Sequence, residues 1–116
     1  MPSFKFPLAV LLAAGAATAQ AHHGWSSYDA GKTVRVETAL VEVKIANPHA
    51  EAVIDHDGKR WQVVLAPVTR MAARGMTDGM LMVGKVITIE GYPRVDGTAE
   101  LCAERIIVDG KTIELR

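Results

Sequence analysis

The chain has 116 residues, of which 49% are hydrophobic, and its 13 basic and 13 acidic side chains give a formal charge of zero. This length allows one domain with a small core. The charge balance excludes electrostatic attraction to nucleic acid or to an anionic membrane, and the single cysteine excludes an internal disulfide.

Residues 1–21 have the pattern of a signal peptide. Lys5 supplies the positive end, and the apolar run over residues 8–17 is too short to span a bilayer. Two overlapping A-x-A patterns end at Ala19 and Ala21, so cleavage after either residue fits the sequence. We predict a periplasmic protein whose mature chain, residues 22–116, has no stable membrane anchor and a formal charge of −1 after the loss of Lys5.

Residues 22–32 show no hydrophobic periodicity and are predicted to form an arm ahead of the domain. Trp25 and Tyr28 are large enough to pin this arm to the domain surface. A first strand is predicted over residues 34–46, where apolar and polar residues alternate but the phase changes halfway. The two apolar sets are Val34, Val36 and Leu40, then Val41, Val43 and Ile45. Because a strand that swaps its buried face usually carries a bulge or a bend, we expect a bend near Leu40.

The segment Asn47-Pro48-His49 ends the first strand, because proline cannot donate to a ladder and restricts the residue before it. A second strand is predicted over residues 50–56. The dipeptide Asp57-Gly58 then turns the chain tightly into a third strand over residues 60–66. The sequence therefore predicts a three-stranded meander from the end of the arm to residue 66.

The third strand and the segment after it supply apolar side chains to the core. Trp61 shares one strand face with Val63 and Leu65, so we expect its side chain to be mostly buried. Pro67 is suited to the first turn of a helix and begins a short helix predicted over residues 68–74.

The remaining elements complete an all-β fold with one short helix. Strands are predicted over residues 85–92 and 98–108, and the tail at 111–115 folds back as a short edge strand. The order strand, strand, strand, helix, strand, strand predicts an OB-like five-stranded Greek-key barrel, because a bent first strand serves two sheets and the helix plugs one barrel end. A two-sheet sandwich with one helix is the alternative.

Several short motifs occur together in a characteristic order. They are His22-His23-Gly24-Trp25, Ala46-Asn47-Pro48-His49-Ala50, Asp57-Gly58-Lys59-Arg60-Trp61, Leu65-Ala66-Pro67, Val83-Gly84-Lys85-Val86 and Val108-Asp109-Gly110-Lys111-Thr112. With the signal peptide, this combination resembles a family of small exported bacterial proteins classed as a domain of unknown function. The resemblance covers essentially the whole mature chain. It implies export and a small β-barrel, and it implies no activity.

The histidines point to metal chemistry, because imidazole suits copper, zinc and nickel. A cut after Ala21 makes His22 the amino terminus, so its free amine and ring nitrogen can chelate one metal ion, as in histidine-brace copper proteins. His49 is the candidate for the second imidazole, since Pro48 stiffens the corner that it occupies, and His23 lies beside the chelate. His56, between two aspartates, is typical of a solvated hairpin.

The other cleavage site leaves a different copper-compatible terminus. A cut after Ala19 gives Gln20-Ala21-His22, which offers an amine, two amides and an imidazole to square-planar Cu(II). Three methionines, Met76, Met80 and Met82, are weaker candidates because thioethers bind Cu(I). Methionine also fills irregular gaps in cores, and this is the alternative for all three.

The sequence favours a binding protein over an enzyme. Cys102 shares its parity with Glu100 and Glu104, so we expect an outward-facing surface thiol with no partnered base. We also find no glycine-rich loop ahead of a helix. The prediction is a small non-enzymatic periplasmic module that binds copper through His22, His23 and His49. The alternative is a metal-free adaptor or ligand-binding barrel, whose partner is a periplasmic protein or a small ligand rather than nucleic acid.

Overall fold

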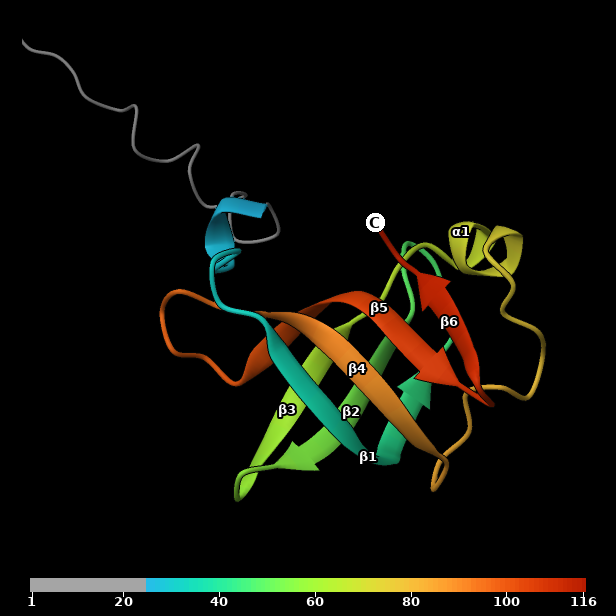
Figure 1. Ribbon diagram of the computed structural model, residues 1–116, viewed down its shortest axis with the longest axis horizontal. Helices are drawn as coiled ribbons and strands as arrows, with labels where there is room; N and C mark the ends of the chain where they lie inside the picture. Colours follow the sequence, from blue (N-terminus) through green and yellow to red (C-terminus); the bar gives the residue numbers. More distant parts are fainter. Residues whose placement is uncertain (1–24) are drawn as a thin grey trace, which may run out of the picture.

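The computed structural model describes residues 25–116 (Figure 1). Within this range the chain forms a short 3-10 helix, an α-helix and six strands. In chain order these are η2 (Trp25–Ser27), β1 (Val34–Lys44), β2 (Glu51–His56), β3 (Lys59–Val64), α1 (Val68–Ala73), β4 (Val86–Pro93), β5 (Glu100–Val108) and β6 (Lys111–Glu114). The predicted signal peptide, both cleavage sites, His22 and His23 lie outside the described residues.

The sheet closes on itself, so the fold is the OB-like barrel that the element order predicts. Adjacent strands follow the order β3-β2-β1-β4-β5-β6, and an additional parallel pairing joins β3 to β5. That pairing aligns Gln62 with Glu100 and Val64 with Cys102, which closes five strands into a barrel. β6 pairs antiparallel with β5 as the predicted extra edge strand. The two-sheet sandwich is therefore excluded.

β1 bends where its hydrophobic phase changes, as predicted. Residues 34–39 pair with β4, whereas residues 40–44 pair with β2, and the register shifts between Leu40 and Glu42. The side chain of Leu40 is only 2% exposed. One long strand thus serves two sides of the barrel because a bulge changes the face that it buries.

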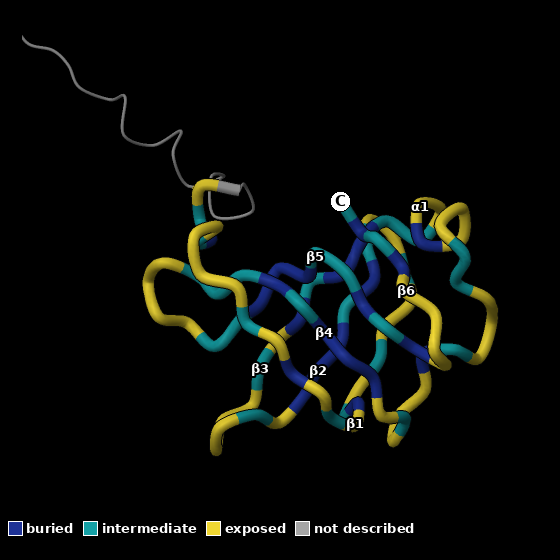
Figure 2. The backbone as a smooth tube through the Cα atoms, viewed as in Figure 1, coloured by how far each residue is buried: buried dark blue, intermediate teal, exposed yellow. Residues whose placement is uncertain are grey.

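The barrel interior is filled mainly by aliphatic side chains, and Figure 2 shows the buried positions distributed along the strands while the turns are exposed. The helix α1 contributes Met71, which is fully buried. In Figure 1 α1 lies beside the end of β6. There Arg70 donates to the carbonyl of Leu115 at 3.0 Å and Arg74 donates to the carbonyl of Glu114 at 3.0 Å. The helix therefore covers one barrel end and fixes the tail. None of the helices within residues 25–116 is long and apolar enough to cross a bilayer.

Trp61 is less buried than predicted. Val63 and Leu65 on the same face are fully buried, but Trp61 is only partly buried against the core. The indole nitrogen donates to the carbonyl of His56 at 3.0 Å, and the ammonium of Lys59 lies 5.8 Å from the ring centroid. Trp61 lies closer to the β2–β3 turn than its two neighbours, so part of its ring remains at the barrel surface.

Candidate functional site

A pocket of about 540 Å³ opens on the outer wall of the barrel, and we call it the arm pocket. Its polar lining comes from segments far apart in the sequence, namely Tyr28, His49, Glu51, Gln62, Glu100, Cys102 and Arg116. Its apolar lining includes Pro48, Val64, Leu65 and Pro67. Only barrel closure brings these segments together, because β3 and β5 become neighbours through that pairing.

The arm is fixed to the barrel at this pocket. Tyr28 is 7% exposed, its hydroxyl donates to the carboxylate of Glu100, and its ring lies 5.7 Å from the guanidinium carbon of Arg94. Backbone bonds from Asp29 to the Pro93 carbonyl, 2.8 Å, and from Val95 to the Ser27 carbonyl, 3.0 Å, hold the same segment. Burial, and then the hydrogen bond to Glu100, raises the pKa of Tyr28, so its hydroxyl stays protonated. The prediction that Tyr28 pins the arm is confirmed, whereas the side chain of Trp25 lies outside what the structure describes.

His49 lies at the corner between β1 and β2, directly after a cis peptide bond that joins Asn47 to Pro48. Its ring is about one-third exposed and borders the arm pocket. The ring nitrogen Nδ1 lies 3.4 Å from the carbonyl oxygen of Ala50 and 3.8 Å from a carboxylate oxygen of Glu51. The predicted metal ligand therefore reaches a pocket, with oxygen atoms beside one of its two nitrogens.

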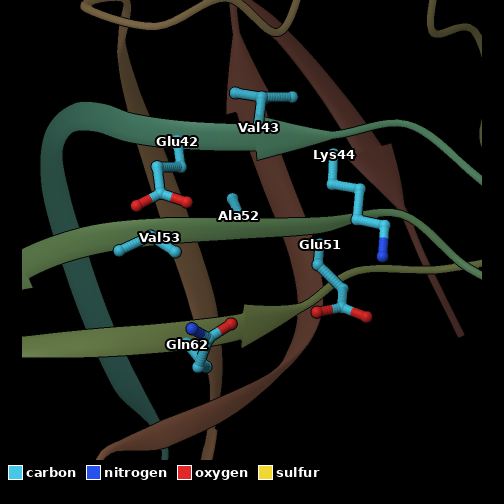
Figure 3. Close-up of a pocket in the computed structure, with 7 residues that line it drawn as sticks. All are labelled: Glu42, Val43, Lys44, Glu51, Ala52, Val53 and Gln62. Carbon is cyan, nitrogen blue, oxygen red and sulfur yellow. The ribbon is translucent and has the colours of Figure 1, made fainter.

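A smaller hollow of about 220 Å³ adjoins the arm pocket, and the two share Glu51 and Gln62 (Figure 3). Glu42 and Glu51 come from the neighbouring strands β1 and β2 and stand at different positions along the same outer face. Glu51 is thus the acidic side chain that connects this face with the His49 corner.

Cys102 is not the surface thiol that its parity predicts. It does lie on the wall that borders the arm pocket, but it is only 5% exposed. Arg116 covers it, with one guanidinium nitrogen 3.0 Å from the sulfur and 2.6 Å from the carbonyl oxygen of Leu65. Burial raises the pKa of the Cys102 thiol, although the nearby Arg116 charge opposes this effect. The thiol therefore stays protonated near neutral pH.

The other candidate metal ligands are dispersed among the described residues. His56 lies at the far end of β2 from His49, roughly 20 Å away at the usual rise per strand residue. Met76 and Met80 pack against the core, and Met82 is 58% exposed. Residues 25–116 contain no cluster of three or more histidine, cysteine or acidic side chains suited to a metal ion.

Sequence reasoning did not find the arm pocket itself. Glu100 and Arg116 showed no motif, and their roles depend on contacts with Tyr28 and Cys102 across the barrel wall. The one available signal was an aromatic residue in a polar arm, which marked Tyr28 as an anchor.

These features define a small OB-like barrel with a ligand-sized pocket at the base of its N-terminal arm. The chain matches the family model described as "Family of unknown function (DUF6152)" over residues 9–102, and it belongs to that family. No curated protein matches the chain.

Proposed function

We propose that the protein is an exported, periplasmic, non-enzymatic module that binds one copper ion between its mature amino terminus and His49. One observation carries this proposal: Tyr28 and His49 line the same pocket. His22 precedes Tyr28 by six residues, and six extended residues span at most about 20 Å. A terminus that starts at His22 can therefore return to the pocket.

The ligand set follows from this arrangement. The amine and ring of His22 supply two nitrogens to one metal ion, and the imidazole of His49 supplies a third. His23 offers another imidazole beside the chelate. All of these are nitrogen ligands, for which divalent copper has a higher affinity than zinc in the general order for first-row ions.

The side chains around the pocket support binding rather than catalysis. The hydroxyl of Tyr28 already donates to Glu100, and the buried Cys102 thiol is covered by Arg116. The pKa of each group is raised rather than lowered, so neither group has the low pKa of an activated nucleophile.

The proposal is tested by intact mass of the exported protein, to locate the cleavage site, and then by calorimetric titration with Cu(II) and Zn(II). We expect one copper ion per chain, bound more tightly than zinc and more weakly as the pH falls through the imidazole range, because the ligands must lose their protons. His22→Ala and His49→Ala each weaken binding. His56→Ala is the matched control, since His56 lies at the opposite end of β2. Copper binding that is indifferent to both His22 and His49 would contradict the proposal.

The volume of the arm pocket supports a second candidate function. At about 540 Å³ it has the size of a small-molecule site, and Pro48, Val64, Leu65 and Pro67 give it an apolar wall. A metal-free ligand-binding or adaptor barrel is therefore the alternative. It predicts that removing the apolar wall, for example by Val64→Ser, abolishes ligand retention in the purified protein, whereas His49→Ala has little effect.

A further inference from the structure

We propose that Glu51 is a positioning residue, which together with the carbonyl of Ala50 holds His49 as the Nδ1–H tautomer, so that Nε2 is the metal-binding atom. This inference rests on the proposed copper function and names the atom and the supporting residue of that site. Two contacts carry it: Nδ1 of His49 lies 3.4 Å from the Ala50 carbonyl oxygen and 3.8 Å from the Glu51 carboxylate.

Both neighbours of Nδ1 accept hydrogen bonds and cannot donate them at neutral pH. A backbone carbonyl oxygen has only lone pairs, and so does an ionised carboxylate. A neutral imidazole carries its proton on one nitrogen, and the partners of each nitrogen decide which one. Two oxygens on the Nδ1 side therefore favour the proton at Nδ1 and leave the lone pair at Nε2.

The location of His49 suits the Nδ1–H tautomer to metal binding. Nδ1 is the ring nitrogen nearer the backbone, and its oxygen neighbours belong to the next two residues of the chain. Nε2 is at the outer end of the ring, and His49 borders the arm pocket with about one-third of its side chain exposed. Metal-ligating histidines commonly donate their second N–H to a carboxylate or a backbone carbonyl, which fixes the ring and increases its basicity as a ligand.

Glu51 is suited to this role because its position is determined by the strand. It is the first residue of β2 and pairs in register with Lys44 of β1 and with Val64 of β3. Its carboxylate stands on the outer face (Figure 3), and one carboxylate oxygen lies 3.8 Å from Nδ1 of His49. At 3.8 Å its effect on the ring is electrostatic, and the shorter Ala50 contact supplies the directional hydrogen bond.

The chain offers a matched control. Glu42 is an exposed carboxylate on the same outer face, one strand away (Figure 3). Glu42→Ala removes the same charge from the same wall without changing the surroundings of His49. Both Glu42 and Glu51 are at the surface, so both variants are expected to keep the wild-type thermal midpoint.

The first measurement needs no metal. Long-range ¹H–¹⁵N correlation spectra of the mature protein at pH 8, where an unperturbed imidazole is neutral, report the tautomer of His49 directly. We expect Nδ1–H in the wild type and in Glu42→Ala, and a mixture of tautomers in Glu51→Ala. Glu51→Gln keeps an oxygen acceptor and is expected to retain more of the Nδ1–H form than Glu51→Ala.

The second measurement is Cu(II) titration of the same variants. Glu51→Ala is expected to bind more weakly by up to about tenfold at unchanged one-to-one stoichiometry, because the carboxylate beside Nδ1 is lost while the Ala50 carbonyl remains. Glu42→Ala is expected to bind as the wild type does. This inference alone is overturned if the wild-type protein binds copper but holds His49 as Nε2–H. It is also overturned if Glu51→Ala changes neither the tautomer of His49 nor the copper affinity. A wild-type protein without His49-dependent copper binding overturns the proposed function, and the positioning role with it.

Discussion

Cys102 shows how one distant residue changes the environment of another. Strand parity places Cys102 beside Glu100 and Glu104, but the guanidinium of Arg116 covers the sulfur at 3.0 Å. The strand pattern contains no information about this cover, because Arg116 follows β6 and reaches Cys102 only in the folded barrel. The consequence is a buried thiol with a raised pKa.

We predict that the thiol reacts slowly. A disulfide reagent such as Ellman's reagent is expected to modify folded protein at pH 8 at least roughly tenfold more slowly than protein in urea, since both access and thiolate formation are suppressed. Arg116→Ala, which uncovers the sulfur, is expected to speed the reaction, whereas Arg60→Ala at an exposed position of β3 is not. Equal rates in folded and unfolded protein would show that Cys102 is accessible.

Trp61 gives a stability prediction at the same scale. Complete burial would make Trp61→Ala cost about 3–5 kcal/mol. The indole is only partly buried, so we expect about 2 kcal/mol, including the hydrogen bond to the His56 carbonyl. Urea denaturation measures this cost, and Trp61→Phe, which keeps an aromatic ring, is expected to lose less. A loss above about 4 kcal/mol would mean that Trp61 belongs to the sealed core.

At the scale of elements, the sequence predicted the features that depend on residues close together in the chain, namely the bend of β1 and the tight turns. The phase change around Leu40 predicted the bend of β1, because it reports which face each half of the strand buries. The dipeptides Asp57-Gly58 and Asp109-Gly110 predicted tight turns, and all four residues have positive φ angles between 53° and 76°. Contacts between elements were not predictable in this way, since they depend on how the barrel closes.

A ladder of alternating charges across four strands is such a contact. Glu90 on β4 lies between Arg35 on β1 and Arg105 on β5, and Arg105 also donates to Glu114 on β6 at 2.9 Å. The hydrogen bond from Arg105, at 2.8 Å, is the main cause that holds the pKa of Glu90 below its usual value. The two ion pairs that Glu90 makes, with Arg35 and Arg105, therefore contribute stability only while Glu90 is ionised.

The sign of the pH dependence follows from this. A carboxylate whose pKa is lower in the folded than in the unfolded state stabilises the fold above its unfolded value, near 4.5, and the benefit disappears as the pH falls through the folded value. Below about pH 5 we expect the urea midpoint of unfolding to decrease with pH, and to decrease less steeply in Glu90→Gln than in the wild type. Glu37→Gln, an exposed position on β1 outside the ladder, serves as the control. A loss of stability below about pH 5 that is as steep in Glu90→Gln as in the wild type would contradict this role.

At the scale of the whole molecule, the fold was predictable and the pocket was not. Element order and one bent strand suffice to indicate an OB-like barrel, because only a few topologies accommodate them. The arm pocket instead combines Tyr28, His49, Cys102 and Arg116 from both ends and the middle of the chain. Motif reasoning identified His49 by its chemistry alone, whereas the barrel places it at the same pocket as Tyr28 of the arm.

The most direct test of the copper proposal compares two forms of the mature protein. Both begin at His22, and in the second form the amine of His22 is acetylated, which removes it as a metal ligand. Calorimetric titration with Cu(II) is expected to give tight one-to-one binding for the first form and binding weaker by about tenfold or more for the second, because the chelate is broken. Equal affinities in the two forms would contradict a copper site built on the amino terminus.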